Sequence, residues 1–482
     1  GVDGESKPYR STDLYAAVKG IDFIIDGHSH TVMTKGENGE PIQSTGTAFA
    51  NIGVIVIDDA TKKIESNSLF EIKEDTAKDA TVAAAAQKII DRIDKEYGAV
   101  FAKSEVVLNG AKAPNGNRDS ETNNGDLITD AMVWKILQDK ESLTVDADHV
   151  VAVTNGGGIR KAINPGDVTK KNINEVLPFG NTVVTIYITG AELLEALEAS
   201  TYCTPDAIGG FPQVSGINYT ISTAVAYDAN AETYPASTYY GPKSINRVTI
   251  NSINGKEFKA DDTYAVITND FCGGGGDTYY AFAAATAKFD TGIPLDEVVM
   301  EYITAELKGV IGKQYAAPQG RILMNPFADV KASSWFGKYV IDLYNDGIIN
   351  GTSATTYAPN NTLTWAAALK LLLVSNGDLK AADATGADWS KNAIAKAAEL
   401  GLVAADLDGA KAISRLEFCQ VAAKLNKLAE SKTESKFTDC TDGYVMALVD
   451  AKVISGMAET TFEPAASLTR AQIAAILSRM AK

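Results

Sequence analysis

The sequence predicts two fold classes in one chain, an α/β front part followed by an all-α module of repeats. Between residues 99 and 325, short apolar runs of the β type alternate with segments of helical periodicity, which is typical of mixed α/β domains. From Phe327 onward a two-helix pattern recurs, and such units bury their apolar faces only against one another. No stretch approaches the roughly 20 apolar residues of a membrane span, so we expect no direct membrane insertion.

Length and charge narrow the class of protein further. At 482 residues the chain is long enough for about three domains. Residues 327–482 carry 16 Lys and Arg against 17 Asp and Glu, whereas the remainder carries 28 against 44. Such an acidic front part argues against binding of a nucleic acid polymer. The near-neutral tail could bind an anionic polymer without strong overall repulsion. The four cysteines show no C-x-x-C spacing, which excludes a disulfide scaffold and a thiolate zinc site.

The first 98 residues are expected to form a strand-rich segment and a helix. In residues 1–75 the predicted strands are Phe23–Ile25, Thr47–Phe49 and Val54–Ile57. Residues 76–98 are rich in alanine, with isoleucines spaced for one helical face and no proline or glycine before Gly98, which predicts a linker helix. The chain begins at Gly1 rather than at methionine and without a leader, so we expect a processed product or a fragment of a longer gene product.

Residues 99–325 are expected to place polar loops at strand ends. A helix is predicted from Asn123, taken as its capping residue, and three buried strands follow along the chain. These strands are Val150–Thr154, which ends at Asn155-Gly-Gly-Gly; Val183–Ile188, followed by the cap Thr189 and the helix Ala191–Ala199; and Tyr264–Thr268, which ends at Asn269-Asp-Phe-Cys-Gly-Gly-Gly-Gly-Asp277. Sites in such domains lie in the loops at strand ends.

Residues 326–482 contain three copies of one pattern. The first and third copies agree in their opening, Phe327-Ala-Asp and Phe437-Thr-Asp, and in a proline eight residues after a glycine. Five residues beyond each proline, Thr364-Trp-Ala-Ala and Thr469-Arg-Ala-Gln begin an apolar helix. A more divergent middle copy has its first helix from Trp389 to Val403 and its second after Ser414. Three helix–loop–helix units should therefore form one module.

Two of the three histidines in the chain lie close together after an apolar run. The stretch Ile21-Asp-Phe-Ile-Ile-Asp-Gly-His-Ser-His30 places His28 and His30 where a buried strand would end. Neutral imidazole is a good ligand for Zn, Mn and Fe. Two imidazoles do not complete a site, however, and no third ligand is near in sequence. The third histidine, His149, precedes a buried strand without a partner motif and is interpreted as structural.

Several motifs in one order give the front part a resemblance to the 5′-nucleotidase family. Ile24-Ile-Asp-Gly-His-Ser-His-Thr31 resembles the last metal motif of its metallophosphoesterase domain. The segments that resemble its C-terminal, substrate-binding domain are Arg118-Asp-Ser-Glu-Thr-Asn-Asn-Gly125, Asn155-Gly-Gly-Gly-Ile-Arg160, Pro178-Phe-Gly-Asn181 and Asn269 to Asp277. The resemblance implies the end of a four-layer sandwich followed by a mixed α/β substrate domain. It also implies that His28 and His30 each bind one of two divalent metals, with Mn, Zn, Mg, Fe and Ca all open.

The chemistry of the residues agrees with a nucleotide as the ligand. Phe179 and Phe271, at loop tips, could cover the two faces of a base, and Asp277 could accept hydrogen bonds from ribose hydroxyls. Glycines at 273–276 would let the backbone approach the ligand closely. The remaining candidates are Arg118 and Arg160 for the ribose and phosphate side, Asn155 beside them, and Asn181 for a base contact.

The glycines at 273–276 do not fit two other phosphate-binding motifs. They lack the Lys-Ser/Thr ending of a P-loop and the spacing of a dinucleotide fingerprint. The neighbouring Cys272 is not expected to be a nucleophile, because the chain holds no further histidine to activate it. The glycines are therefore interpreted as allowing close backbone approach to a ligand, and Cys272 as an ordinary small side chain.

The catalytic motifs of the 5′-nucleotidase family do not occur in the family's order and context. Bare matches to the shorter patterns exist, such as Asp26-Gly-His28, but Gly-Asn-His-Glu is absent. In the family, the Asp-x-His, Gly-Asp and Gly-Asn-His-Glu motifs precede the Gly-His-x-His motif and would lie before Gly1. We therefore expect no catalytic residue in this chain, weak metal binding, and little or no turnover by the chain alone. The intact protein is expected to be a metal-dependent phosphoric monoester hydrolase of the 5′-nucleotidase type.

The tail resembles three S-layer homology repeats, a family whose repeats hold anionic secondary polysaccharide of the bacterial cell wall. Its Thr-Arg-Ala-Glu signature corresponds here to Ser414-Arg415-Leu-Glu417 and Thr469-Arg470-Ala-Gln472, and to Thr364-Trp365-Ala-Ala in the first copy. The resemblance implies that Arg415 and Arg470 bind the polymer, because a guanidinium fork suits carboxylate or phosphate groups. The alternative is that they only cap helices or pair with Glu417.

Together these features predict an extracellular 5′-nucleotidase held in the bacterial cell wall or S-layer. Two alternatives remain open from the sequence. One is an S-layer or wall-binding structural protein with a vestigial enzyme part. The other is an enzyme of the same family that hydrolyses UDP-sugars or 2′,3′-cyclic nucleotides.

Overall fold

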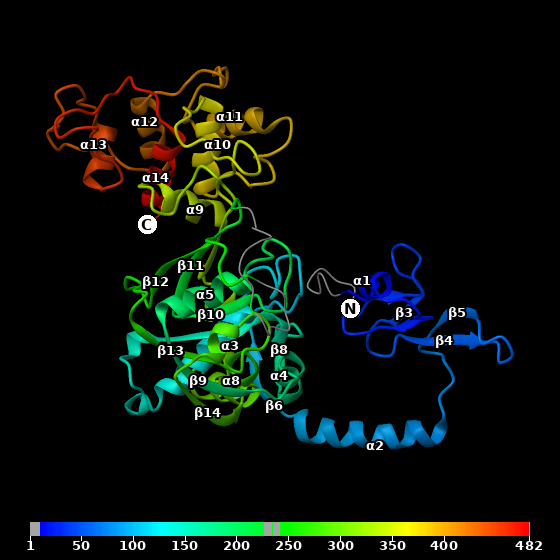
Figure 1. Ribbon diagram of the computed structural model, residues 1–482. Coiled ribbons are helices and arrows are strands. Elements are labelled where there is room, and N and C mark those ends of the chain that lie inside the picture. Colours follow the sequence, from blue (N-terminus) through cyan, green and yellow to red (C-terminus); the bar gives the residue numbers. More distant parts are fainter. Residues whose placement is uncertain (1–9, 226–233, 235–241, 482) are drawn as a thin grey trace. The chain divides into compact units, whose positions relative to one another are not determined.

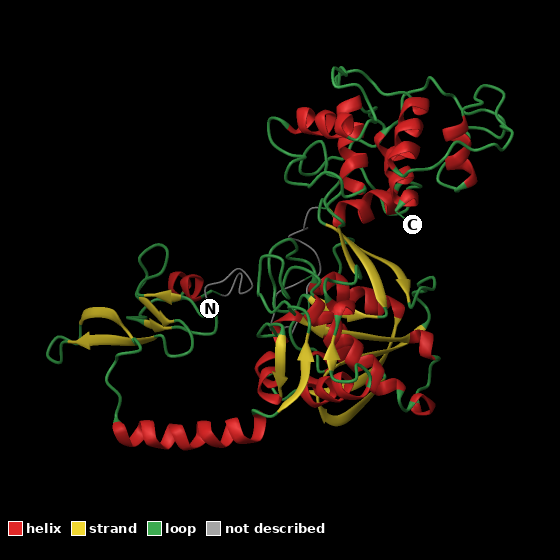
Figure 2. Cartoon of the chain, turned by 180° about the vertical axis from the view of Figure 1, so that it is seen from behind, coloured by secondary structure: helices red, strands yellow, loops and turns green. Residues whose placement is uncertain are grey.

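A computed structural model describes residues 10–225, 234 and 242–481 (Figure 1). Gly1, where the sequence begins, lies outside this part. The internal contacts divide the chain into two compact units: the first is Gly1–Asn218, Tyr227–Asn246 and Ile250–Arg321, and the second is Tyr219–Ala226, Arg247–Thr249 and Ile322–Lys482. The front of the chain mixes strands and helices, and the C-terminal module consists of helices and loops (Figure 2). The fold is thus mixed α/β followed by all-α, as the sequence predicts.

The N-terminal segment is built from short strands. Its elements are α1 (Ser11–Ala17), β1 (Ile24–Ile25), β2 (Val32–Met33), β3 (Ile42–Thr45), β4 (Asn51–Ile57) and β5 (Ile64–Glu71). β3 lies between β1, which is parallel to it, and β2, which is antiparallel, while β4 and β5 form a separate antiparallel hairpin. The predicted strand Thr47–Phe49 is wrong. Ala48 and Phe49 have φ angles of 53° and 57°, which turn the chain instead of extending it.

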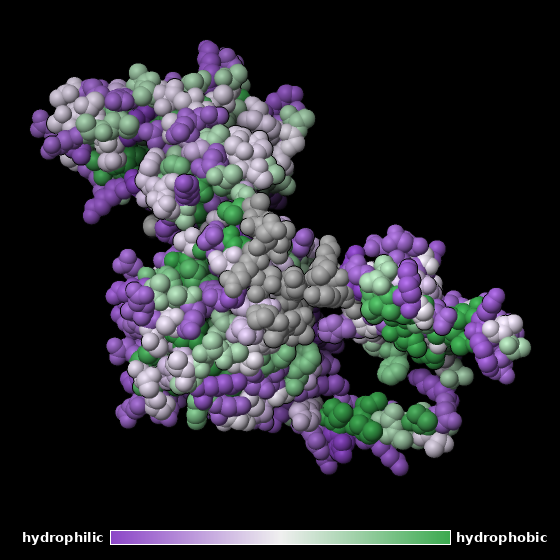
Figure 3. Space-filling model, in the orientation of Figure 1, coloured by the Kyte–Doolittle hydropathy of each residue, from purple (hydrophilic) through white to green (hydrophobic). Residues whose placement is uncertain are grey.

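A single helix joins this segment to the rest of the chain. α2 (Ala80–Tyr97) begins after Asp79, whose carboxylate accepts hydrogen bonds from the backbone N–H groups of Thr81 and Val82, both at 2.9 Å. None of its residues is buried. Its larger apolar side chains are therefore exposed, and Figure 3 shows them along the helix.

The α/β domain is organised around a five-stranded sheet in the order β10-β7-β13-β9-β14. β7 and β13 are parallel, and the other neighbours are antiparallel. Every residue of β7 is buried, which explains why its sequence is a continuous β-type run. The strands are β7 (Val150–Asn155), β9 (Thr182–Thr189), β10 (Pro212–Ser215), β13 (Thr263–Asn269) and β14 (Ala287–Pro294).

Helices cover this sheet and complete its core. α3 (Asn123–Leu137) packs on β7, β10 and α8 (Leu295–Ala305), and buries Leu127 and Ile128 completely. The cap of α3 is Thr122, not Asn123 as predicted, because the Thr122 hydroxyl accepts the hydrogen bond from Gly125 N at 3.1 Å. Asn123 instead bonds to the backbone of the loop at Asn109.

The remaining elements form two smaller sheets and short helices. β15-β6-β8 and β12-β11-β16 are three-stranded, with β11 parallel to β16. The strands are β6 (Val100–Ser104), β8 (Gly166–Thr169), β11 (Ile217–Ser222), β12 (Val248–Ile253), β15 (Val310–Ile311) and β16 (Ile322–Asn325). The helices are α4 (Lys170–Val176), α5 (Gly190–Ser200), α6 (Asp270–Gly273) and α7 (Tyr280–Ala283). Thr189 caps α5, as predicted. Short 3-10 helices span Lys140–Ser142, Ala147–His149, Gly156–Gly158 and Lys313–Tyr315.

The helical module is a closed ring of three copies, at residues 327–375, 389–425 and 437–480. Each copy contributes two helices: α9 (Gly337–Asn345) and α10 (Trp365–Ser375), α11 (Trp389–Glu399) and α12 (Arg415–Leu425), and α13 (Gly443–Asp450) and α14 (Arg470–Met480). The first N–H of each second helix donates to a carbonyl of the next copy: Trp365 to Lys411, Arg415 to Ala466, and Arg470 to Asn361, at 2.8–2.9 Å. Because copy 3 returns to copy 1, the ring closes.

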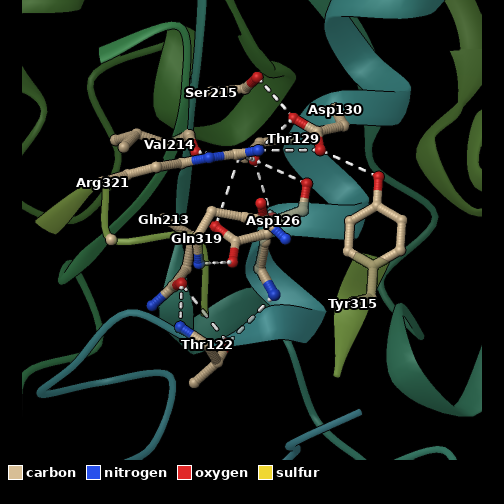
Figure 4. A network of polar contacts seen from close by, with 12 residues as sticks. Thr122, Asp126, Thr129, Asp130, Gln213, Val214, Ser215, Tyr315, Gln319 and Arg321 are labelled. Atoms are coloured by element: carbon tan, nitrogen blue, oxygen red, sulfur yellow. Dashed lines mark hydrogen bonds and ion pairs between the residues drawn. The ribbon is translucent and has the colours of Figure 1, made fainter. Parts of the chain in front are cut away.

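A buried ionic network ties the C-terminal end of the α/β domain to α3 (Figure 4). Arg321 lies 2.8 Å from Asp130 and 3.5 Å from Asp126, and donates a hydrogen bond to the Val214 carbonyl at 2.8 Å. Tyr315 donates to Asp130 at 2.9 Å. Asp126 is 1% exposed, and burial, followed by the charge of Glu121, raises the pKa of Asp126 to about 8.

Asp126 should make the domain less stable as the pH rises. Between its ordinary pKa near 3.8 and its folded value of about 8, the folded state holds a proton that the unfolded state has lost. The contribution of Asp126 to stability is therefore complete below about pH 4 and declines up to about pH 8. Asp126→Asn should flatten this decline in calorimetric melting between pH 5 and 8.

Asp439→Asn provides the control for this pH dependence. Hydrogen bonds from the backbone of Phe462 and Glu463 lower the pKa of Asp439, so that this group is ionised across the same pH range. The Asp439→Asn variant should keep the wild-type slope. Equal slopes for the wild type and Asp126→Asn would contradict the assignment.

Candidate functional site

The polar side chains at the carboxyl ends of β7 and β13 form a connected chain. The two strands are parallel neighbours, so their last residues, Asn155 and Asn269, lie at the same edge of the sheet. The amide of Asn269 donates to Thr154 Oγ1 at 3.0 Å and to Asn155 Oδ1 at 3.1 Å. The amide of Asn155 then donates to Asp277 Oδ2 at 2.7 Å. These bonds fix the orientation of the Asp277 carboxylate.

The loop from Asn269 to Asp277 shapes one wall of the site. Asn269 caps α6 by accepting from Cys272 N at 2.8 Å, and Asp277, with a φ of 52°, is only 3% exposed. A Cβ at Gly276 would come within 2.5 Å of the Phe271 ring, so a glycine is needed for the loop to pass beneath that ring. Burial raises the pKa of the Cys272 thiol well above its usual range, which leaves it protonated and unsuited to be a nucleophile.

Two aromatic rings stand out into solvent at the same site. Phe179 is 59% exposed and Phe271 is 46% exposed. The guanidinium of Arg160 lies 5.5 Å from the centre of the Phe179 ring and donates to the Gly157 carbonyl at 3.0 Å. Asn181 follows Phe179 by two residues, and its side-chain amide donates a hydrogen bond to the carboxylate of Asp270 at 2.7 Å.

All seven candidates that the sequence places in this domain line a single cavity. They are Arg118, Asn155, Arg160, Phe179, Asn181, Phe271 and Asp277. Sequence reasoning missed Lys112 and Lys161, which line the same cavity. The position of Lys161 directly after Arg160 was an available signal, whereas nothing in the sequence pointed to Lys112. The cavity combines exposed aromatic rings, cations and one oriented carboxylate, which are the groups that bind a base, a phosphate and a sugar hydroxyl.

The two predicted metal ligands lie on a turn after β1. His28 and His30 are exposed and have φ angles of 71° and 60°. Within the described residues, no three His, Cys, Asp or Glu side chains are grouped so that they could hold a metal ion. Two imidazoles are fewer than the three protein ligands of a typical catalytic zinc site. The described residues therefore do not complete a metal site.

The two arginines of the helical module lie at junctions between copies. Arg415, only 7% exposed, donates to the Ser455 carbonyl at 2.7 Å, and its guanidinium lies 4.7 Å from the centre of the Phe462 ring. Glu417 accepts hydrogen bonds from the backbone N–H and the hydroxyl of Ser414, as in a capping box. The contacts of Arg415 therefore reach the third copy.

Arg470 makes the corresponding junction between the third and first copies. It donates to the carbonyls of Tyr357 and Asn350, both at 2.7 Å, and lies 4.4 Å from the centre of the Tyr357 ring. Burial lowers the pKa of both Arg415 and Arg470, yet a guanidinium remains charged at any ordinary pH. At the third junction, between the first and second copies, Trp365 stands at the position of the arginine and Leu407 at the position of the aromatic residue.

No helix among the described residues is both long enough and apolar enough to cross a membrane.

Comparison with known families identifies both parts of the chain. Residues 100–284 match the model of the 5′-nucleotidase C-terminal domain, and residues 326–368 and 439–474 match the S-layer homology domain. The trifunctional nucleotide phosphoesterase protein YfkN of Bacillus subtilis is 33% identical over 331 residues, which are 65% of this chain and 20% of that protein. The 5′-nucleotidase of Mus musculus is 27% identical over 333 residues, 63% of this chain and 54% of that enzyme.

The matched region covers 20% and 59% of the length of the first two curated relatives, so the chain spans only part of them. A solved structure, the 5′-nucleotidase precursor of Thermus thermophilus, is 26% identical with a TM-score of 0.46, over 63% of this chain and 59% of that one. By the family models, residues 100–284 form a 5′-nucleotidase C-terminal domain, and S-layer homology sequence follows at residues 326–368 and 439–474.

Proposed function

We propose that the α/β domain binds a nucleotide for hydrolysis of its phosphate ester, and that the helical module attaches the protein to anionic polysaccharide of the bacterial cell wall. The observation that carries the first half is the convergence of the seven candidate residues on one cavity. The second half is supported by the S-layer homology match and by the two arginines at the junctions between copies.

Each group in the cavity has a role that suits its environment. The base would lie against Phe179 and Phe271, whose exposed faces are available for stacking, with Asn181 beside it. Asp277, oriented by Asn155, would accept hydrogen bonds from the ribose hydroxyls. Arg118 and Arg160 would hold the phosphate, because guanidinium groups make paired, charge-assisted hydrogen bonds to phosphate oxygens.

The share of this chain in hydrolysis is substrate binding. His28 and His30 would contribute two metal ligands, and a divalent ion would supply Lewis-acid chemistry at the phosphate. Because the described residues do not complete that site, we expect binding and turnover to separate. AMP should bind this chain in the presence of EDTA, while phosphate release with added Mn²⁺ should be slight or absent. A chain that does not bind AMP would refute the proposed function.

Attachment to the wall should depend on the planar guanidinium fork. The double variant Arg415→Lys/Arg470→Lys keeps both charges but loses the fork, so co-sedimentation with purified, protein-free cell-wall fragments should weaken by about tenfold. Arg479→Lys on the same helix as Arg470 is the matched control, because Arg479 lies against Tyr339 and outside the signature positions. If the double variant sediments as well as the wild type, the two arginines do not bind the polymer and serve only to join the copies of the ring.

A further inference from the structure

His149, for which the sequence shows no partner motif, lies between two carboxylates in the structure. It ends the 3-10 helix Ala147–His149, directly before β7. Its Nδ1 atom lies 2.7 Å from Asp148 Oδ1. Its Nε2 atom lies 3.3 Å from Oδ2 of Asp262, the residue directly before β13. Each ring nitrogen therefore faces a carboxylate oxygen.

Only the charged imidazole can donate a hydrogen bond to both carboxylates. A neutral imidazole has one N–H group, and its second nitrogen is an acceptor. An ionised carboxylate is also an acceptor, so that one of the two contacts would then bring two lone pairs together. In the imidazolium both nitrogens donate. The geometry at His149 thus fits the protonated ring and not the neutral one.

Asp148 is held in place by the turn after β12. Lys256 on that turn forms an ion pair with Asp148 and is itself influenced by the charge of Asp146. Lys256, followed by His149, lowers the pKa of Asp148 to about 2, so that Asp148 stays ionised wherever His149 titrates. The Asn254 side chain also donates to the Asp148 carbonyl at 3.0 Å. The turn is thereby attached to the 3-10 helix.

The start of β13 supplies the second carboxylate and a stacking surface. The His149 ring stacks on Tyr264, with ring centres 5.2 Å apart and planes inclined by 28°. A cation over the face of an aromatic ring is attracted by it, so this contact also favours the charged ring. Lys256 and Lys259 carry the same charge as that ring, but each lies beside a carboxylate that it shares with His149, and Lys259 is 4.0 Å from Asp262.

We propose that His149 is a pH-sensitive latch, which when protonated fastens the amino ends of β7 and β13 to each other and to the turn after β12. The hydrogen bond to Asp148, and then that to Asp262, raise the pKa of His149 above its ordinary value of 6.5 against the opposing effect of burial. Because the folded pKa is raised, the latch contributes fully to stability well below pH 6.5 and loses its contribution as the pH rises through the folded value.

Hydrogen exchange of the peptides that cover residues 140–150 and 254–263, read by mass spectrometry at about pH 5.5 and about pH 8, tests this latch. The exchange rate in His149→Gln is divided by the wild-type rate at the same pH, so that the intrinsic effect of pH and the titration of Asp126 cancel. Glutamine keeps one donor, as neutral histidine does. The ratio should be about fivefold larger at the lower pH, as expected for two partly exposed ion pairs.

Two further variants distinguish the latch from other effects of pH. Asp148→Asn/Asp262→Asn keeps the His149 ring but removes both acceptors, and its ratio to the wild type should also be larger at the lower pH. His28→Gln/His30→Gln removes the other two histidines and should give equal ratios at both pH values. Equal ratios for His149→Gln, or for the aspartate double variant, would overturn the latch. A pH-dependent ratio in the His28/His30 control would overturn it as well.

Discussion

Replacing Arg321 with methionine should lower the free energy of unfolding of the α/β domain by about 3 kcal/mol. Methionine fills much of the same volume but leaves the Asp130 carboxylate, whose side chain is 22% exposed, without its cation. It also removes the donor to the Val214 carbonyl on β10. Breaking a buried ion pair from one side is costly because an uncompensated charge remains in a poorly solvated environment.

Hydrogen exchange of the α3 peptides, read by mass spectrometry, measures this loss. A decrease of about 3 kcal/mol accelerates exchange of globally protected amides by roughly two orders of magnitude. Lys135→Met is the matched control: its partner Glu301 is 46% exposed, so that this ion pair should contribute about 1 kcal/mol or less. Similar acceleration in the two variants would show that Arg321 acts as an ordinary surface residue.

The double variant Phe179→Ala/Phe271→Ala should lose at least about 30-fold in affinity for AMP. Stacking of a base on an aromatic side chain is worth about 1–3 kcal/mol for each ring by alanine substitution. Both rings are exposed in the free protein, so their removal should cost the fold little. Titration calorimetry in EDTA gives the affinity, and melting temperature reports whether the fold is retained.

Phe289→Ala controls for the general loss of an aromatic ring. Phe289 lies on β14 in the same domain, is 64% exposed, and is not among the residues that line the cavity. Its removal should leave AMP affinity within about twofold. An affinity of the double variant equal to that of Phe289→Ala would place the base elsewhere than between these rings.

Three strands of the central sheet, β7, β9 and β13, were predicted because burial imposes a simple pattern, whereas β10 and β14 were not predicted. β7 is buried along its whole length and β9 along most of its length. A buried strand of this kind has a nearly continuous run of β-branched residues, which is rarely seen in other elements. The failure at Thr47–Phe49 has the opposite cause. A short apolar stretch does not reveal that Ala48 and Phe49 take left-handed backbone angles, since ordinary residues seldom do.

The candidate site was predictable where residue types are grouped in motifs at strand ends. Asn155, Arg160, Phe271 and Asp277 lie in two such motifs, and the parallel pairing of β7 and β13 brings the motifs together. Lys112 carries no such signal, because only the close approach at Gly110 places its loop beside the cavity. The roles of these residues in binding remain predictions.

The ionic network and the arginine junctions could not be predicted from the sequence, since they join residues far apart in it. Arg321 meets Asp126 and Asp130 only after the end of the domain has folded back onto α3. Arg470 likewise meets Tyr357 only because the third copy closes the ring onto the first. Local patterns predict helices and strands, and tertiary contacts select which charges become partners.

One chain should hold a nucleotide with its α/β domain and a wall polymer with its helical module. To test this, protein-free cell-wall fragments are sedimented with labelled AMP, in EDTA, with and without the protein. Labelled AMP should enter the pellet only when the protein is present, and excess unlabelled AMP should displace it. Protein that pellets without AMP, or that stays in the supernatant, would contradict it.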